Sequence, residues 1–286
     1  MALLPPRFLD GVVAIGRELE RGQFDWYGTG ILFAELTKFH QEEKVYDFTA
    51  WLVTCRHVFR DEQEAYVRLN LKNGEIRDIK LLLHNHNKQQ WTGHPDEMVD
   101  VAVFGLDAQQ FRYAGVDEAY IFSANCWTMS QMLDQGASEG DGVFVLGYPL
   151  GNISRGRQCA IARAGIIARI RDAYERSPSD YLIDAHIFEG NSGGPVVTRP
   201  EFSHIQDTKT ITQCMVIGIV THVHAYNMRS QLLVKGDDGK FKLDDRTQVR
   251  LKDPAGLARV EPTDRIFETI AAHRARIDPA DGRVVQ

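Results

Sequence analysis

Glycines surround a single serine in the stretch Phe188-Glu189-Gly190-Asn191-Ser192-Gly193-Gly194-Pro195. Glycine permits backbone conformations with positive φ and lets another group approach closely, and asparagine tolerates such turns as well. The stretch is therefore predicted to hold the Ser192 hydroxyl on a tight turn, with the amides of Gly190 and Ser192 free to converge on one point. A hydroxyl nucleophile beside two N–H donors is what acyl transfer requires. The alternative is an ordinary glycine-rich hairpin between two strands.

A serine hydroxyl becomes a good nucleophile when a base takes its proton, and histidine suits that role near neutral pH. Among ten histidines, His57 stands out because it lies just after the apolar, strand-like run 48–55, with only Arg56 between them. Asp100 stands in the same way immediately before the run 101–104, where it could hold one tautomer of an imidazole ring. Asp96 is the competing acid, but it lies in a turn-like segment where an aspartate is common.

Short runs of β-branched and aromatic residues must position these groups, and they predict an all-β fold of barrel or sandwich type. Strand-like runs cover 12–15, 26–33, 48–55, 65–71, 76–83, 100–104, 143–146, 181–184 and 215–223. Asn73-Gly74 is the strongest hairpin signal in the chain. Gly28-Thr29-Gly30 predicts a bulge or sharp bend, and residues 159–170 predict a hairpin that breaks around Gly165.

Helices are expected in only two places. A short one is predicted around 127–133, and a longer one at about 263–276, with Thr263 or Asp264 as its cap. The apolar stripe of the second helix predicts that it packs on the second half of the protein. Asp237-Asp238-Gly239 predicts a turn.

The composition narrows the class of protein. Hydrophobic residues make up 43% of the 286 residues and charged residues 25%, which is typical of a soluble globular protein, and the net charge of −6 argues against nucleic acid as a partner. The sequence contains neither a secretory signal nor an apolar run long enough for a membrane span. Its cysteines form no CxxC pair and are expected to be buried free thiols, in a cytoplasmic protein: Cys55, Cys126, Cys159 and Cys214.

Four segments, in order along the chain, resemble the trypsin-like serine peptidases of the chymotrypsin fold, nearest to their HtrA-like bacterial branch. They are Thr54-Cys55-Arg56-His57-Val58, Asp100-Val101-Ala102-Val103, Gly190-Asn191-Ser192-Gly193-Gly194-Pro195 and Ile217-Gly218-Ile219-Val220-Thr221. Gly28-Thr29-Gly30-Ile31-Leu32 and Gly147-Tyr148-Pro149-Leu150-Gly151 are similar to weaker patterns of the family. The resemblance covers about residues 10–230, and the sequence predicts no PDZ-like module after it.

The resemblance implies two packed six-stranded antiparallel β-barrels with a C-terminal α-helix. The first barrel, 10–125, would carry His57 and Asp100, and the second, 126–286, would carry Ser192. His57 would act as general base and acid, Asp100 as its orienting carboxylate and Ser192 as nucleophile, with the amides of Gly190 and Ser192 as the oxyanion hole. The implied function is a serine endopeptidase that cleaves protein or peptide substrates through an acyl-enzyme and needs no cofactor. The alternative is a catalytically silent domain that binds peptides or partner proteins.

Two departures from the secreted members of the family favour a bacterial, intracellular enzyme. Asn191 occupies the position at which those enzymes have the aspartate that pairs with a newly cut N-terminus, so activation by such a cut is not expected. Val58 follows His57, so the disulfide next to the catalytic histidine is absent as well. The oligomeric state is left open.

The resemblance also suggests a substrate pocket formed by His186 and by Thr221-His222-Val223. No acid lies among these residues, so a preference for arginine or lysine is not expected. Val223 predicts a shallow pocket for small or aliphatic side chains, and His186 could alternatively accept an acidic one.

Two further patterns do not predict a site. Histidines at 84, 86 and 94, and at 222 and 224, lack clustered cysteine or carboxylate partners, so no metal site is predicted. Residues 190–194 also fit the G-x-S-x-G elbow of α/β-hydrolases, which places a helix after the serine. Pro195 and the β-branched residues after it contradict that helix.

Overall fold

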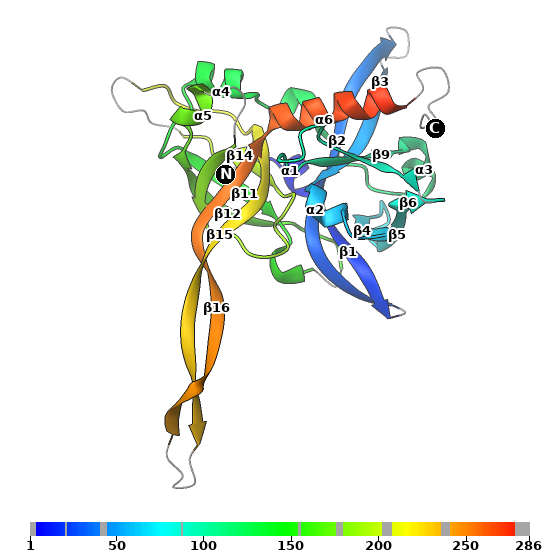
Figure 1. Ribbon diagram of the computed structural model, residues 1–286. Helices are drawn as coiled ribbons and strands as arrows, with labels where there is room; N and C mark the ends of the chain where they lie inside the picture. The colour runs from blue at the N-terminus through cyan, green and yellow to red at the C-terminus, as the bar shows by residue number, and fades with distance from the viewer. Residues whose placement is uncertain are drawn as a thin grey trace.

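Two groups of antiparallel strands, one from each half of the chain, make up most of the protein (Figure 1). The computed structural model describes residues 4–20, 22–40, 45–86, 88–153, 156–175, 180–201, 208–235 and 241–277. The first half contains α1 (Pro6–Asp10), β1 (Val12–Glu20), β2 (Gln23–His40), β3 (Val45–Thr54), α2 (Arg56–Phe59), β4 (Glu64–Asn70), β5 (Ile76–Leu82), β6 (His84–Asn85), β7 (Lys88–Gln89), β8 (Trp91–Gly93), β9 (Ala102–Leu106), α3 (Ala108–Tyr113), β10 (Ile121–Phe122) and η1 (Ser123–Asn125). The second contains α4 (Met129–Gln135), β11 (Gly142–Gly147), η2 (Pro149–Gly151), β12 (Ile161–Arg169), α5 (Arg171–Glu175), β13 (Tyr181–Ala185), β14 (Pro195–Thr198), β15 (Val216–Lys235), β16 (Phe241–Pro262) and α6 (Thr263–Arg276).

The first half is a curled eight-stranded sheet with the order β5-β4-β1-β2-β3-β9-β8, and β10 pairs in parallel with β2. The predicted chymotrypsin-like, all-β fold is confirmed, but the main sheet of this half has eight strands and is not a closed barrel, in contrast to the expected six-stranded barrel. The reason is that the short strands β8 and β10 extend the six-stranded core, β8 on β9 and β10 on β2. The core of this half includes Ile15, Phe33 and Trp51, each at most 1% exposed.

The second half is a closed six-stranded barrel with the order β11-β12-β13-β16-β15-β14. The predicted hairpin break at Gly165 is wrong, because β12 continues through this residue and pairs it with Ala185. A Cβ atom at position 165 would lie 2.4 Å from the Asp184 carbonyl oxygen. The glycine therefore permits close approach of β13 and does not make a turn. The boundary predicted at residues 125 and 126 falls between β10 and β11 and stays a prediction.

Local turn signals in the first half correspond well to the structure. β4 and β5 pair with Asn70 opposite Ile76, and Gly74 takes φ +87 between them, so the predicted hairpin is confirmed. A bulge is present, but it lies just before the predicted segment 28–30. Ile15 pairs with Gly28 and the next residue, Gly16, pairs with Trp26, so Tyr27 is the extra residue. The turn predicted at 237–239 lies outside the described residues.

Both predicted helices are present, but the C-terminal one is capped and packed differently from the expectation. Neither Thr263 nor Asp264 caps α6; the Asp264 carboxylate instead accepts the backbone N–H of Met129 at the start of α4. The buried side chains of Ile266 and Ile270 belong to a core cluster that consists mostly of first-half residues and also includes second-half residues such as Val197 and Ile219. α6 starts at the second barrel and runs across the first sheet (Figure 1), so that it contacts β15 and β16 as well as β8 and β9; the prediction that it packs on the second barrel is therefore only partly right.

The described residues include no helix long and apolar enough to cross a membrane. All four cysteines are free thiols. Cys55 and Cys126 are buried as predicted, whereas Cys159 is exposed and Cys214 half-buried, so the expectation of burial is wrong for these two.

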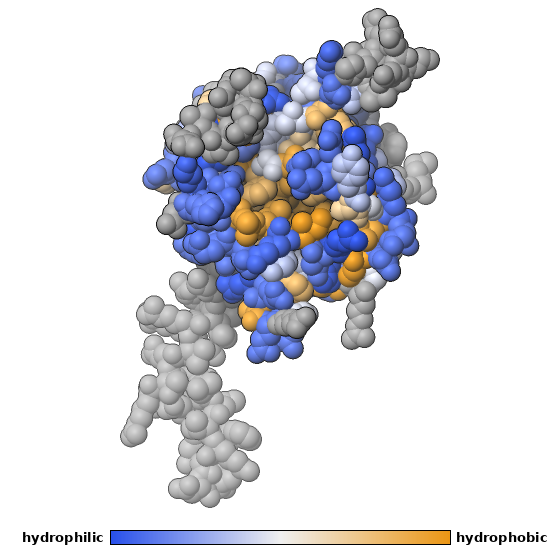
Figure 2. Space-filling view, turned by 90° about the vertical axis from the view of Figure 1, so that its right-hand side faces the viewer, coloured by the Kyte–Doolittle hydropathy of each residue, from blue (hydrophilic) through white to orange (hydrophobic). Residues whose placement is uncertain are grey.

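A cavity of about 930 Å³ lies where the end of α6 meets β3 and β9. Its apolar lining includes Trp51, Phe104 and Leu106. Figure 2 looks onto this side of the protein, where apolar side chains appear in a hollow between polar ones. None of the candidate site residues chosen from the sequence lines this cavity.

Candidate active site

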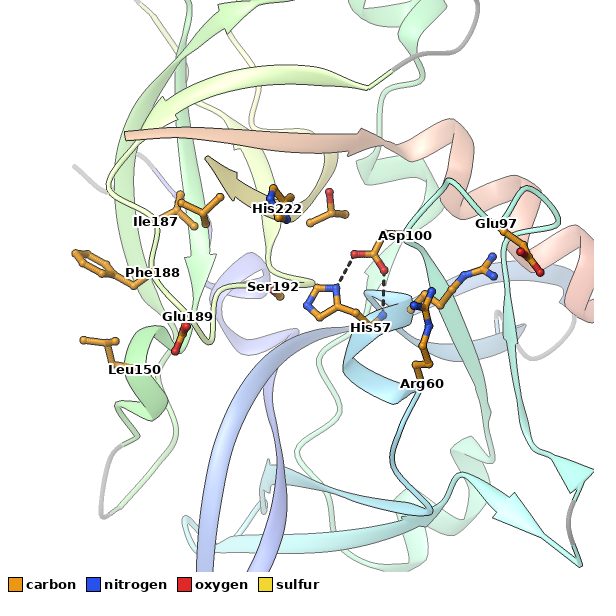
Figure 3. A pocket seen from close by; sticks show the side chains of 13 residues that line it. His57, Arg60, Glu97, Asp100, Leu150, Ile187, Phe188, Glu189, Ser192 and His222 are labelled. Atoms are coloured by element: carbon orange, nitrogen blue, oxygen red, sulfur yellow. Dashed lines mark hydrogen bonds and ion pairs between the residues drawn. The ribbon is translucent and has the colours of Figure 1, made fainter. Parts of the chain in front are cut away.

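His57 and Asp100 are joined by two hydrogen bonds. His57 lies on the single helical turn α2, directly after β3. Its backbone N–H donates to Asp100 Oδ1 at 3.0 Å, and its Nδ1 lies 2.6 Å from Asp100 Oδ2 (Figure 3). The two bonds fix the carboxylate and the ring in one relative orientation, with Nε2 of the ring left for another partner.

Asp100 is presented by the loop between β8 and β9, and this loop is held in place from two sides. The Arg56 guanidinium donates to the carbonyl oxygens of His94 and Asp96. His94 Nε2 lies 2.7 Å from Glu268 Oε2 on α6, and its Nδ1 accepts the N–H of Asp96. Asp96, the competing acid, is exposed, and its carboxylate accepts the N–H of Met98 within the turn. The structure therefore brings Asp100 to His57 and keeps Asp96 apart from it.

Ser192 lies on the turn between β13 and β14, and hydrogen bonds within the loop shape that turn. Asn191 N–H donates to the Phe188 carbonyl at 3.1 Å, and Gly190 takes φ +93, which is the geometry that a type II turn requires at its third residue. Gly194 N–H donates to the Asn191 carbonyl at 2.8 Å. A Cβ at Gly190 would lie 2.4 Å from the Tyr148 carbonyl oxygen, so glycine is needed here for space as well as for φ.

The amides of Gly190 and Ser192 have no hydrogen-bond partner within the described part of the chain, although those of Asn191, Gly193 and Gly194 all have one. The Glu189 carbonyl accepts the N–H of Leu150 at 2.7 Å and so points toward η2. Because C=O and N–H of one trans peptide point in opposite directions, this bond directs the Gly190 N–H away from η2. Two unpaired N–H groups beside a hydroxyl can donate hydrogen bonds to the oxyanion that forms in acyl transfer.

Ser192 and His57 line the same two cavities, and Figure 3 shows them beside each other. No hydrogen bond between Ser192 Oγ and the His57 ring occurs among the described residues. In serine hydrolases without substrate this contact is often long and tightens when substrate binds.

A cavity of about 770 Å³ extends to one side of Ser192 and His57. Thr221, His222 and Val223 line it, in agreement with the residues chosen from the sequence. His186 does not; its side chain is exposed, and Ile187 lines the cavity in its place. The cause is the alternation of β13, which continues past the end of the strand at Ala185: every second residue from Tyr181 to Ile187 is buried, so that His186 points to solvent.

A second cavity of about 650 Å³ extends to the other side of the serine. It shares His57, Leu150, Glu189 and Ser192 with the first, and its other lining residues include Trp26 and Tyr27. The two cavities thus form one groove that passes over the serine hydroxyl.

Cys55, His57 and Asp100 form a group of three side chains whose ligand atoms all lie within 4.8 Å of one another, the spacing of a metal site. The Cys55 thiol is fully buried and donates to the Val220 carbonyl at 3.2 Å. Burial, with the negative charge of Asp100 as a smaller cause, raises the pKa of this thiol well above its usual value. A protonated, hydrogen-bonded thiol is a poor metal ligand, so the group is better described as the support behind the His57–Asp100 pair.

Glu261 is a buried acid behind this pair that the sequence did not single out. Only 4% of it is exposed, and it pairs across the second barrel with Ile219, which is fully buried. Burial raises its pKa to about 7, and the charges of Asp180 and Asp100 add to the rise, while Arg265 and Arg259 oppose it. Glu261 is therefore uncharged in weakly acidic solution.

Sequence reasoning missed several residues that hold the site together. Thr29 was noted only as part of a glycine bulge, yet its hydroxyl contacts the serine loop. The link from His94 to Glu268 joins residues 174 positions apart, and no local pattern predicts it. Ile187 could have been found from the alternation of the strand before the serine.

Comparison with known proteins identifies one family and a large number of similar solved structures. Residues 28–201 match the model of a family described as trypsin-like peptidase domain. No curated protein matches the sequence significantly. Solved structures that are similar include the apo MamO protease domain of Magnetospirillum magneticum, at 14% identity and a TM-score of 0.45 over 93% of this chain and 97% of that one. Another is the inactive form of the Rv3671c protease, at 16% identity and a TM-score of 0.40 over 93% and 90% of the two chains.

Proposed function

The chain belongs to the trypsin-like peptidase domain family, and from this premise we propose that it is a serine endopeptidase acting through an acyl-enzyme. The observation that carries the proposal is that the hydrogen-bonded pair of His57 and Asp100 lines the same groove as Ser192, whose own amide and that of Gly190 are unpaired among the described residues. A base, a nucleophile and two N–H donors at one point supply each element of acyl transfer.

In the proposed reaction, His57 Nε2 takes the proton of Ser192 Oγ as this oxygen attacks the carbonyl carbon of the scissile peptide bond. The carbonyl oxygen becomes an oxyanion and accepts hydrogen bonds from the amides of Gly190 and Ser192. Asp100 Oδ2 accepts the Nδ1–H of the imidazolium. His57 then gives its proton to the leaving amine, and water enters by the reverse of these steps to hydrolyse the ester on Ser192.

The groove supports cleavage within a chain and not only at its end. One cavity lies on each side of the serine, and both include His57, so that a peptide can extend past the nucleophile in both directions. On the side of the first cavity, Ile187, Phe188 and Val223 line an apolar wall. We infer that small or aliphatic side chains precede the cleaved bond.

A fluorophosphonate probe tests the enzyme against the silent peptide-binding domain. The probe phosphonylates a serine only where a base and an oxyanion site are in place. We expect labelling of the wild type that disappears in Ser192→Ala and falls by about four orders of magnitude in His57→Ala. A folded wild-type protein that is not labelled would rule out the proposed function and favour the binding domain.

Cleavage of a peptide library then tests the preference for aliphatic residues. A dominant preference for acidic residues would instead favour a role for His186, which lies exposed outside the cavity. The cytoplasmic location remains a proposal, and the free thiols are its support.

A further inference from the structure

Thr29 of β2 is the residue of the first half that holds the serine loop of the second half. Its N–H donates to the Ser192 carbonyl at 2.9 Å, and its hydroxyl donates to the Gly190 carbonyl at 2.6 Å. The same hydroxyl accepts the N–H of Tyr148 at 3.1 Å, and the Thr29 carbonyl accepts the hydroxyl of Thr54 at 2.7 Å. Thr29 is fully buried, and all of its polar groups are hydrogen-bonded.

With these bonds, the carbonyl groups of four successive peptides, those of residues 189–192, all accept a hydrogen bond. The Glu189 carbonyl is held by Leu150, and the Asn191 carbonyl by Gly194. Thr29 holds the two that remain, those of Gly190 and Ser192. A peptide plane can rotate only when its carbonyl is released, and here every carbonyl from 189 to 192 has a donor.

The neighbouring glycines show how closely Thr29 is fitted to this loop. A Cβ at Gly193 would lie 2.1 Å from the Thr29 carbonyl oxygen, and a Cβ at Gly147 would lie 2.9 Å from the Thr29 hydroxyl oxygen. Side chains at either position would therefore push Thr29 and the loop apart.

We propose that Thr29 is a positioning residue for the oxyanion site. Its hydroxyl holds the Gly190–Asn191 peptide, which lies between the two peptides that carry the Gly190 and Ser192 amides, and so keeps both amides in the orientation that acyl transfer uses. This inference rests on the proposed function. Thr29 does not touch the reacting atoms; it acts through the carbonyls of the loop. Without the hydroxyl, the Gly190 carbonyl and the Tyr148 N–H would both be buried without a partner, and rotation of the Gly190–Asn191 peptide would relieve this for the carbonyl. Because this peptide shares the Cα atoms of Gly190 and Asn191 with its neighbours, the rotation would also turn the peptides that carry the Gly190 and Ser192 amides.

Thr29→Val tests the proposal because valine keeps the shape of threonine and removes only the hydroxyl. Displacing one oxyanion donor lowers the rate by about two to three orders of magnitude, so we expect phosphonylation by a fluorophosphonate probe to slow by about 100-fold to 1,000-fold. Thr29→Ser, which keeps the hydroxyl, should react within about tenfold of the wild type. If Thr29→Val does not fold, Thr29→Cys, with a thiol that is only a weak donor, replaces it.

Thr198→Val is a matched control. The Thr198 hydroxyl is also fully buried, donates to the carbonyl of Gln213 at 2.6 Å and accepts the N–H of Met215 at 2.9 Å. Its replacement removes the same pair of bonds but leaves the serine loop untouched. We expect its labelling rate to stay within about threefold of the wild type at a similar loss of stability. Equal labelling rates for Thr29→Val and Thr198→Val would overturn the proposal.

Hydrogen exchange of the backbone amides separates this proposal from the proposed function, because it needs no activity. In Thr29→Val the amides of Tyr148, Leu150, Asn191, Gly193 and Gly194, which are hydrogen-bonded in the wild type, should exchange at least about tenfold faster, and in Thr198→Val they should not. A wild type that is never labelled would refute the peptidase activity, and the exchange data would still decide whether Thr29 holds the loop. Amide exchange in Thr29→Val that is unchanged from the wild type would refute the proposal that Thr29 holds the loop.

Discussion

Replacing Asp100 by asparagine changes one atom of the candidate site and should nearly abolish turnover. Asp100 accepts the His57 N–H at Oδ1 and lies 2.6 Å from His57 Nδ1 at Oδ2. An asparagine can keep only one of these acceptors and presents an NH₂ group in place of the other. With its oxygen on the backbone N–H, it would place a donor against Nδ1, so the ring would carry its proton on Nε2 and could not take the proton of Ser192.

The expected loss of turnover is the loss that follows when His57 can no longer act as a base but the protein stays folded. Loss of the correct tautomer lowers turnover by about 10⁴ in triads of this type, which corresponds to about 5.5 kcal/mol of transition-state stabilisation. The local fold should survive, since the asparagine oxygen would still accept the backbone bond that ties α2 to the loop before β9.

Asp96→Asn is the control in the same loop. The Asp96 carboxylate accepts only the N–H of Met98 among the described residues, and asparagine can accept this bond equally well. The labelling rate of Asp96→Asn should lie within about twofold of the wild type. The assay is the rate of phosphonylation at matched concentrations of folded protein. A loss of less than tenfold in Asp100→Asn, or a larger loss in Asp96→Asn, would refute the assignment of the orienting acid.

Three further substitutions test other parts of the structure. The folded protein keeps the proton of buried Glu261 up to about pH 7, whereas the unfolded chain releases it near pH 4.5. The free energy of unfolding of the wild type should therefore fall as the pH rises through this range, by about 3 kcal/mol at most, while that of Glu261→Gln should not show this fall. Unfolding free energies at pH 5 and pH 8 measure the difference. Gly190 has φ +93, and Gly190→Ala would place a Cβ 2.4 Å from the Tyr148 carbonyl oxygen. The substitution should therefore displace the loop that carries the oxyanion donors and slow labelling by at least about 100-fold. Its control is Gly74→Ala, which has φ +87 with no atom within 4 Å, should cost about 1 kcal/mol of stability and should leave labelling unchanged. Burial alone would raise the pKa of the Glu268 carboxyl. Hydrogen bonds from Arg265 and His94 lower it by more than burial raises it, so the pKa lies below its usual value. The wild type should therefore lose more stability than Glu268→Gln when the pH falls from 5 to 3, and equal losses in thermal melts would contradict this.

The parts of the site that the sequence predicted are those with a local signal. His57 lies just after a strand and Asp100 just before one, and a short apolar run is enough to recognise such strand ends. Gly190 and Gly193 have positive φ in the turn around Ser192, which is a conformation that the glycine pattern itself requires.

The parts that failed depend on contacts between distant segments. The prediction of His186 rests on its distance in sequence from Ser192, but the alternation of β13 decides which side chain faces the groove, and it selects Ile187. The stripe of α6 predicted a helix and its contact with the second barrel but not its contact with the first sheet, because apolar side chains such as Ile266 can pack on either half. Gly165 predicted a turn because its nearness to β13 cannot be read from its neighbours in sequence.

The two halves of the protein are joined by buried hydrogen bonds next to the candidate site. The Thr29 hydroxyl donates to the Gly190 carbonyl, the Cys55 thiol to the Val220 carbonyl and the Tyr148 hydroxyl to the Val12 carbonyl. An unpaired buried polar group is costly, so these bonds favour a single way of docking one half on the other.

That single way of docking also bears on activation. The Asn191 side chain donates to the Phe188 carbonyl within its own turn, and the loop is held from outside through Thr29 and Leu150. All of these partners are neutral and present in the folded chain, so no new charged N-terminus is needed to set the loop. We infer that folding itself, by docking the two halves, prepares the candidate oxyanion site.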